Sequence, residues 1–341
     1  MPALKWDLFC RVIDNLGDAG VCWRLAAELA ARGEAVRLVI DDPVPLALIA
    51  PHGVRGVEVL PWPGPAVPGD VVIEAFGCDP PPAFVDAMAA MHPQPIWLNL
   101  EYLSAEDHVE RSHGLPSPQP SGLVKWFYYP GFTPRTGGLL RESGLMQARR
   151  AFDRRVWLAQ KGLTQKPGER VVTLFCYDNP AIASLVAELA GAPTLLLLTP
   201  GPAQQQVVHA PPGLRLHALP WLSQTEFDHL LWACDLNFIR GEDSLVRALW
   251  AGQPFVWQLY PQHDGAHAAK LEAMLQWLAA PPELAALWRA WNGLQPGAWP
   301  GLPPVARWRA QAEGWRQALL EQADLASQLQ AFVRGKRGPR C

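Results

Sequence analysis

The start of the chain alternates between short apolar runs and a longer run with helical spacing. Residues 5–13 (KWDLFCRVI) and 35–42 (AVRLVIDD) are rich in β-branched and aromatic side chains and predict two strands. Between them, residues 21–32 have the spacing of an amphipathic helix that ends at Gly33. A strand, a loop, a helix and a strand in this order are typical of a parallel βαβ unit.

The same alternation continues and then begins again in a second half. Residues 133–144 are polar and Gly-rich, a helical stretch follows, and residues 163–169 predict a linker. Two α/β halves of similar size predict two Rossmann-like domains that face an interdomain cleft, with boundaries at 1–155 and 165–317. The remaining strands are expected at 57–62, 70–77, 95–103, 123–131, 170–177, 194–200, 214–220, 236–241 and 254–261, and helices at 81–91, 146–162, 180–191, 223–234, 242–252, 267–279, 281–292 and 306–333.

Composition and charge narrow the class of protein. The 341 residues correspond to about two domains at ~150 residues each, and 49% hydrophobic with 18% charged residues indicates a globular chain. The net charge of −3 and the lack of a basic stripe argue against nucleic acid as a partner. No apolar run is long enough to span a membrane, and the N-terminus is too polar for a signal peptide. Six cysteines without a C-x-x-C motif are expected to be reduced, so we predict a cytoplasmic protein.

The first candidate for chemistry is the loop Asp14-Asn15-Leu16-Gly17-Asp18, between the first strand and the first helix. Ligands of parallel sheets bind where the strands end at their carboxyl termini, and two carboxylates four residues apart can face one pocket there. The structural alternative is that Asp18 N-caps the helix while Asp14 makes an Asx turn. The loop has no G-x-G-x-x-G pattern, so ordinary dinucleotide binding is disfavoured.

The second candidate is Arg240-Gly241-Glu242-Asp243-Ser244, where a predicted strand runs into a predicted helix. Backbone N–H groups at a helix start bind anions, Ser244 adds a hydroxyl, and Arg240 could neutralise a diphosphate. Glu242 and Asp243 are also ordinary first-turn residues, which is the structural alternative.

The third candidate is a group of aromatic and amide side chains in the second half. Phe175 and Tyr177 end a predicted strand, and Gln224 and Phe227 open a predicted helix. Aromatic rings can stack on a nucleobase and an amide can read its edge, although plain core packing is the commoner explanation of any single Phe.

Motifs of several other enzyme classes are absent from the sequence. It contains no Asp-x-Asp, no HExxH, no P-loop and no G-x-S-x-G. His263 and His267 have helical spacing but no obvious further ligand beside them, so we expect no metal site.

Four long blocks together resemble one family. Residues 9–30, 97–106 (WLNLEYLSAE), 174–181 (LFCYDNPA) and 236–262 are similar, in the same order, to the signatures of the EarP family, the bacterial protein-arginine rhamnosyltransferases that modify translation elongation factor P. The resemblance implies an α/β GT-B fold, with an N-terminal domain for the acceptor protein and a C-terminal domain for TDP-β-L-rhamnose. The final helix, at 318–335, would return to the N-terminal domain.

The resemblance also implies an inverting, metal-independent transfer to an arginine guanidino nitrogen, without a cofactor. The family's paired aspartates match Asp18, which we expect to be the base, and Asp14, which would orient the guanidino group. Asn15 and Gly17 would contact the donor. Leu16 stands where the family usually has Phe, an apolar exchange that leaves the chemistry unchanged.

The donor residues implied by the resemblance lie in the second half. Its base-binding aromatics match Phe175 and Phe227, with Tyr177 and Gln224 beside them. Its nucleotide-sugar motif matches Arg240, Glu242, Asp243 and Ser244. Glu242 would either bind sugar hydroxyls or position Arg240. Two alternatives remain open from the residues: another nucleotide-sugar glycosyltransferase with a small acceptor, and a noncatalytic nucleotide-binding protein with two domains.

Overall fold

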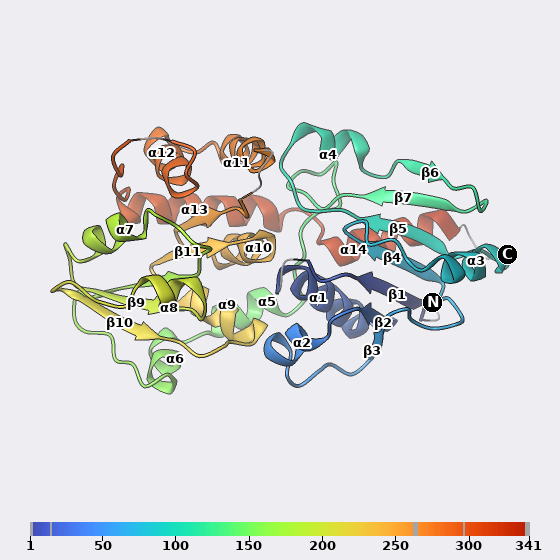
Figure 1. The fold of residues 1–341 in the computed structure, drawn as a ribbon, viewed down its shortest axis with the longest axis horizontal. Helices are drawn as coiled ribbons and strands as arrows, with labels where there is room; N and C mark the ends of the chain where they lie inside the picture. The colour runs from blue at the N-terminus through green and yellow to red at the C-terminus, as the bar shows by residue number, and fades with distance from the viewer. Residues whose placement is uncertain (1–2, 14–15, 262–264, 296, 338–341) are drawn as a thin grey trace. The chain divides into compact units, whose positions relative to one another are not determined.

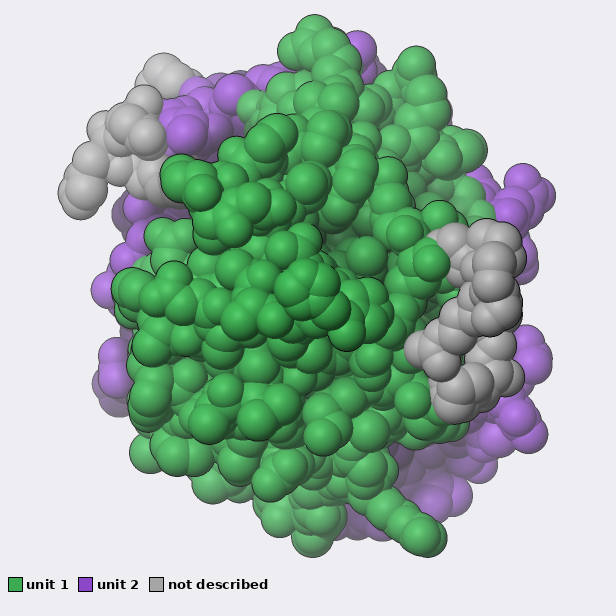
Figure 2. All heavy atoms as spheres, turned by 90° about the vertical axis from the view of Figure 1, so that its right-hand side faces the viewer, with its two compact units in different colours: residues 1–143, 322–341 green, residues 144–321 purple. Residues whose placement is uncertain are grey.

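The chain divides into two units, residues 1–143 with 322–341, and residues 144–321 (Figure 2). The computed structural model describes residues 3–13, 16–261, 265–295 and 297–337. Each unit is built around its own sheet, as Figure 1 shows.

The first unit contains a seven-stranded sheet in the order β3-β2-β1-β4-β5-β7-β6. All neighbouring strands are parallel except β6, which pairs antiparallel with β7 at one edge. The order places the carboxyl ends of β1, β4 and β5 side by side. The strands are β1 (Lys5–Cys10), β2 (Ala35–Ile40), β3 (Val57–Pro61), β4 (Val71–Ala75), β5 (Ile96–Leu100), β6 (Pro116–Pro118) and β7 (Val124–Tyr128).

Both faces of this sheet are covered, which explains why its strands are almost continuously apolar. Side chains alternate along β1, so Trp6 and Leu8 join the cluster under one set of helices while Phe9 joins the opposite cluster. The first cluster includes side chains of α1, α2 and α14, and the second includes Phe84 of α3. The helices of this unit are α1 (Gly17–Ala31), α2 (Val44–Ile49), α3 (Pro82–Ala90), α4 (Asp107–Ser112) and α14 (Leu325–Arg337).

The second unit contains a five-stranded parallel sheet in the order β10-β9-β8-β11-β12. Helices α6 and α9 cover the face of the sheet that carries Val171, and Trp291 of α12 packs against Phe238 on β11. The strands are β8 (Arg170–Leu174), β9 (Thr194–Leu198), β10 (Leu214–Ala218), β11 (Leu236–Arg240) and β12 (Phe255–Gln258). The helices are α5 (Leu145–Ala151), α6 (Arg154–Gln160), α7 (Ile182–Leu189), α8 (Pro202–Gln206), α9 (Gln224–Ala233), α10 (Glu242–Ala251), α11 (Ala266–Trp277), α12 (Pro282–Trp291) and α13 (Val305–Leu320).

The unit boundaries differ from the expected domain boundaries. Residues 144–155 were expected in the N-terminal domain but belong to the second unit. The reason lies in two arginines: Arg149 Nε donates to the Ala251 carbonyl (2.7 Å), and Arg154 pairs with Asp235 (2.7 Å).

Two long predicted helices are each broken by a capping aspartate. The stretch 146–162 forms α5 and α6, because Asp153 accepts the N–H groups of the first turn of α6. The run 306–333 forms α13 and α14, where Asp324 Oδ1 accepts the Ser327 N–H (2.9 Å). Three short helices (α2, α4, α8) and the three-residue strand β6 were not predicted at all, since they are too short to have a periodic pattern.

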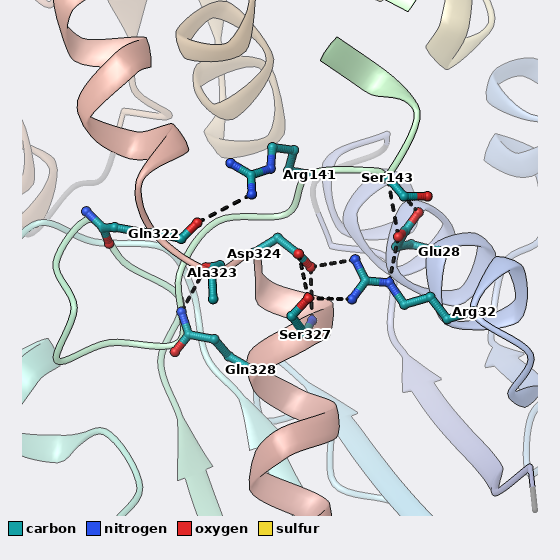
Figure 3. Close-up of polar contacts among 9 residues, drawn as sticks. All are labelled: Glu28, Arg32, Arg141, Ser143, Gln322, Ala323, Asp324, Ser327 and Gln328. Carbon is teal, nitrogen blue, oxygen red and sulfur yellow. Dashed lines mark hydrogen bonds and ion pairs between the residues drawn. The ribbon is translucent and has the colours of Figure 1, made fainter. Parts of the chain in front are cut away.

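The C-terminal helix α14 belongs to the first unit and packs against α1 (Figure 3). Arg32 donates to Glu28 on its own helix (2.6 Å), to Ser327 (2.6 Å) and to Asp324 (2.8 Å). Glu28 also accepts the backbone N–H of Ser143, the last residue before the chain enters the second unit. Glu28 therefore holds the segment that ends at Ser143, and Arg32 holds the segment at Asp324 and Ser327. These are the two segments of the first unit that lead to the second.

Five cysteines in the described residues, Cys10, Cys22, Cys78, Cys176 and Cys234, are buried free thiols. Among those residues, no helix has both the length and the apolar character needed to cross a bilayer.

Candidate active site

Asp18 lies in the first turn of α1, which follows the loop after the carboxyl end of β1. It is buried, and its Oδ2 accepts the backbone N–H of Ile13 (2.9 Å). The N-cap position is Leu16, without a side-chain capping bond, so the alternative that Asp18 N-caps the helix is wrong. Gly17 is the first helical residue, and Asp14 and Asn15 lie outside the described residues, so the predicted aspartate pair stays a prediction.

Buried thiols surround the carboxyl end of β1. The pKa of Cys22 is raised by a hydrogen bond with Cys10 and by burial, and the negative charge of Asp18 raises it further. Burial likewise raises the pKa of Cys78 to about 12. Because the thiolate is the reactive form of cysteine, these raised pKa values argue against a nucleophilic role for the thiols.

A second carboxylate lies at the carboxyl end of β5. Asn99 connects two strand ends: its Oδ1 accepts the Gly77 N–H (3.1 Å) after β4, and its Nδ2 donates to Glu101 Oε1 (2.7 Å). Partial burial raises the pKa of Glu101, against the lowering effect of the Asn99 hydrogen bond. The carboxyl group of Glu101 is therefore held in place at the sheet edge at which β1 also ends.

A stacked aromatic pair stands beside Glu101. Phe76 and Tyr102 have ring centroids 4.3 Å apart and planes only 13° from parallel. Phe76 has φ 58°, a left-handed backbone conformation that is rare for an aromatic residue and is found mostly at functional sites. Phe76 is partly buried against the core, whereas Tyr102 is exposed. A carboxylate next to such an aromatic pair suits a planar cation such as a guanidinium.

Sequence reasoning missed Glu101, Phe76 and Tyr102 as site residues. The available signal was the run N-L-E-Y at the end of an otherwise apolar strand, since a buried Asn and a Glu are unusual there.

In the second unit, Arg240 is held between two aromatic rings. Its guanidinium carbon lies 4.6 Å from the ring centroid of Phe175 and 4.4 Å from that of Tyr177, and Nη1 donates to the Cys176 carbonyl (3.1 Å). These residues come from the adjacent strands β8 and β11, so parallel pairing brings them together. The cation–π contacts orient the guanidinium before any ligand binds.

The aromatic residues predicted for base binding are also neighbours. Phe175 and Phe227 meet edge to face with centroids 5.4 Å apart. Phe227 lies in the first turns of α9, which Ser223 caps through the Glu226 N–H. Gln224 precedes Phe227 by three residues, so both lie on one side of the helix.

The turn before α10 has the features of an anion site. Its N-cap is Gly241 at φ 75°, and no side chain caps the helix, so the first backbone N–H groups are not occupied by a capping side chain. The Gly241 carbonyl accepts the Trp257 indole N–H (2.8 Å), and its N–H donates to the Gln258 carbonyl (3.1 Å). Asp243 lies in the first helical turn and Ser244 is buried there.

Three further residues at this edge were missed. Gln258 Oε1 accepts the Tyr177 N–H (2.9 Å), and the Tyr260 ring meets Tyr177 edge to face at 5.3 Å. Lys270 of α11 forms an ion pair with Glu242. Gln258 and Tyr260 belong to a segment whose apolar character indicated only a strand, and Lys270 lies in an ordinary helical pattern.

His263 lies outside the described residues and His267 belongs to α11. In the described part of the chain, no three His, Cys, Asp or Glu side chains gather in a way that could hold a metal ion.

The family model described as "Elongation-Factor P (EF-P) rhamnosyltransferase EarP" matches residues 6–334. The chain belongs to the EarP family. The predicted resemblance is thereby confirmed, and it extends through both units of this EarP-family chain.

Curated relatives agree over nearly the full length. A protein-arginine rhamnosyltransferase of Pseudomonas aeruginosa is 44% identical over 369 aligned positions, covering 96% of this chain and 98% of the relative. A protein of the same name from Pseudomonas putida is 45% identical over 372 positions, covering 96% and 98%.

Solved structures confirm the predicted GT-B glycosyltransferase fold of this EarP-family chain. A structure that explains EarP-mediated arginine glycosylation of elongation factor EF-P has 31% sequence identity and a TM-score of 0.67, covering 97% of this chain and 99% of the other. The calicheamicin glycosyltransferase CalG4, at 15% identity with a TM-score of 0.52 and coverage of 99% and 100%, shares the fold alone.

Proposed function

We propose that this chain transfers L-rhamnose from TDP-β-L-rhamnose to an arginine side chain of translation elongation factor P in the cytoplasm, with inversion and without a metal. The observation that carries the proposal is the match to the EF-P rhamnosyltransferase family over residues 6–334. A match of this extent argues against the alternative in which only the nucleotide-sugar half is shared with glycosyltransferases.

Asp18 is the proposed general base. A guanidinium is a poor nucleophile because its charge is delocalised and its pKa exceeds ~12. A carboxylate beside it can localise that charge and accept a proton as the new bond forms. Asp18 suits this role because its Oδ2 bond to Ile13 orients the carboxylate, and Asp14 would grip the other side of the guanidino group.

Glu101 and the Phe76–Tyr102 pair are proposed to receive the acceptor arginine alongside the aspartates. Phe76 follows β4, which neighbours the strand that leads to Asp18, and Glu101 and Tyr102 follow β5 on the other side of β4. A carboxylate gives the guanidinium a charge-assisted hydrogen bond, and the aromatic pair gives it a flat surface.

The donor is proposed to bind to the second unit. Its thymine would contact Phe175 and Phe227, with Tyr177 and Gln224 beside them, and Asn15 and Gly17 of the first unit would complete the donor contacts. The diphosphate would bind at the start of α10, where Arg240 and the backbone N–H groups of Asp243 and Ser244 supply positive charge.

The proposed reaction is a single displacement. A guanidino nitrogen attacks the anomeric carbon of rhamnose from the face opposite the diphosphate, the C–N bond forms as the C–O bond breaks, and TDP leaves with the electron pair. The proton of the attacking nitrogen passes to Asp18. Arg240 and the helix start stabilise the charge that develops on the leaving diphosphate, the part that a metal plays in other transferases.

Intact-mass spectrometry of elongation factor P tests the proposal directly. Incubation with this protein and TDP-rhamnose should add the mass of one deoxyhexosyl residue, and an acceptor whose target arginine is replaced by lysine should stay unmodified. An unmodified wild-type acceptor, with donor and folded enzyme present, would refute the proposed function.

A further inference from the structure

An ion pair connects the first residue of α10 to helix α11. Lys270 Nζ contacts Glu242 Oε1, and the two side chains are only 20% and 24% exposed. An ion pair shielded to this degree is screened by solvent and salt less than one on the open surface. It stands at the turn where the donor diphosphate is proposed to bind.

The sequence of this turn presents an electrostatic conflict. Backbone N–H groups at a helix start attract an anion, but α10 opens with the two carboxylates of Glu242 and Asp243. Both would repel a diphosphate. Arg240 brings one positive charge to the turn, and Lys270 brings another directly to the Glu242 carboxylate.

The surroundings of the turn keep this arrangement in place. Trp257 donates to the Gly241 carbonyl (2.8 Å), and Gly241 donates to the carbonyl of Gln258 on the neighbouring strand (3.1 Å). The backbone of the turn is thus held by β12, while the Glu242 side chain is held from α11.

We propose that Lys270 is a positioning residue for donor binding, which neutralises and orients Glu242 so that the start of α10 accepts a nucleoside diphosphate. The inference rests on the proposed function, because it takes this turn as the diphosphate site. It goes further by assigning a role to a lysine in a helix that carries none of the proposed donor contacts.

A double-mutant cycle on TDP affinity, measured by calorimetry, tests the inference. Lys270→Met should weaken TDP binding on the order of tenfold, because the Glu242 carboxylate beside the diphosphate loses the positive charge of Lys270. Lys270→Arg should stay within about threefold of wild type because the charge is kept. In a Glu242→Gln background, Lys270→Met should change the affinity by less than about twofold, since the charge that it neutralises is gone.

Arg289→Met is the matched control. It removes an ion pair between Arg289 of α12 and Glu272 of α11, with side chains 37% and 50% exposed, and should leave TDP affinity unchanged. Melting temperatures show that each variant is folded, and Lys270→Gln serves as a second neutral variant if Lys270→Met is not.

Three outcomes are decisive. Wild-type affinity in both neutral variants overturns the inference. An equal loss with and without Glu242 also overturns it, because the lysine would then contact the phosphate itself. Failure of the wild-type protein to bind TDP would overturn the donor assignment in the proposed function and this inference with it.

Discussion

Asp18 reaches back across its own loop to the backbone of Ile13, and an asparagine could accept the same hydrogen bond. The role of Asp18 in folding can therefore be separated from its role in proton transfer. Burial of the carboxylate in the first turn of α1 is also favoured by the helix dipole, which is a modest effect.

Asp18→Asn should leave the melting temperature and TDP affinity close to wild type. Its rate of rhamnosylation of elongation factor P should fall by roughly 10²–10⁴-fold, because an amide cannot accept the proton. A stable variant that works at nearly the wild-type rate would leave the mechanism without a base.

Glu101→Gln should separate stability from function. Burial raises the pKa of Glu101, so its contribution to stability is present below the ordinary pKa of Glu and is lost as pH rises through the folded-state value. The variant should thus be at least as stable as wild type at pH 7 in urea unfolding and lose this advantage near pH 4. Its kcat/KM for elongation factor P should fall about 10–100-fold, because a charge-assisted hydrogen bond is lost. Unchanged kcat/KM would remove Glu101 from the acceptor site.

At the scale of elements, the donor-side helices α9 and α10 are joined by a buried ion pair. Arg247 Nε and Nη2 donate to the two carboxylate oxygens of Asp228, both at 2.7 Å, and both residues are almost fully buried. Asp228 follows Phe227 directly, and Arg247 lies on the helix that begins at Glu242. The pair therefore fixes how α9, which carries Phe227, packs against α10, whose first turn is the proposed diphosphate site.

Arg247→Met alone should lower the free energy of unfolding by about 3–5 kcal/mol, because the buried Asp228 carboxylate loses its bidentate cation. Adding Asp228→Leu should recover most of that loss, since an apolar pair can replace a buried ion pair. The double variant should still bind TDP more weakly than wild type, as calorimetry can measure. Wild-type affinity in the recovered double variant would show that the pair has no positioning role.

Asp235 connects α6, β8 and α13. Burial opposes its ionisation, but bonds from Arg154 and the Val171 N–H, with the charge of Arg309, lower its pKa overall. A lowered pKa stabilises the fold above the ordinary pKa of Asp, about 3.9, and this contribution is lost as pH falls through the folded-state value.

Asp235→Asn should accordingly be less stable at pH 7 and show a flatter decline in unfolding free energy between about pH 5 and pH 2. Urea unfolding at a series of pH values measures both effects. An equally steep decline in the variant would assign the acid sensitivity to other carboxylates.

For the whole molecule, the chain passes between the units at residues 143–144 and 321–322. Within the first unit, Arg32 and Glu28 hold the segments that lead to both crossings (Figure 3). Further along α14, the Phe332 ring packs against the Tyr128 ring, with centroids 5.5 Å apart.

Arg32→Leu should loosen residues 322–337 from α1 and lower stability by about 3 kcal/mol, because Glu28 and Asp324 lose a shared cation. Limited proteolysis followed by mass spectrometry should release a C-terminal fragment cut near residues 321–324. Arg135→Leu, which breaks an ion pair whose arginine is 78% exposed, is the control and should be cut like wild type. Equal cleavage of Arg32→Leu and the control would contradict the holding role.

Most elements could be predicted from the sequence because their signals are local. The apolar run at 70–77 became β4 (Val71–Ala75), and the pattern at 223–234, with Ser223 as its cap, became α9. The anion site at the start of α10 was predicted in the same way, from a strand end followed by a helix start, and Phe175 and Tyr177 were predicted separately, from another strand end, as base-binding residues.

Other features required the tertiary structure because their partners are far apart in sequence. Arg240 contacts rings more than 60 residues away, Lys270 reaches Glu242 from another helix, and Phe76 stacks on Tyr102 only when β4 and β5 pair. The return of α14 to the first unit depends likewise on Arg32, almost 300 residues earlier. The local pattern of a segment indicates which of its apolar side chains are buried. The partner of a charged side chain depends on strand order and helix packing, which cannot be predicted from any single segment.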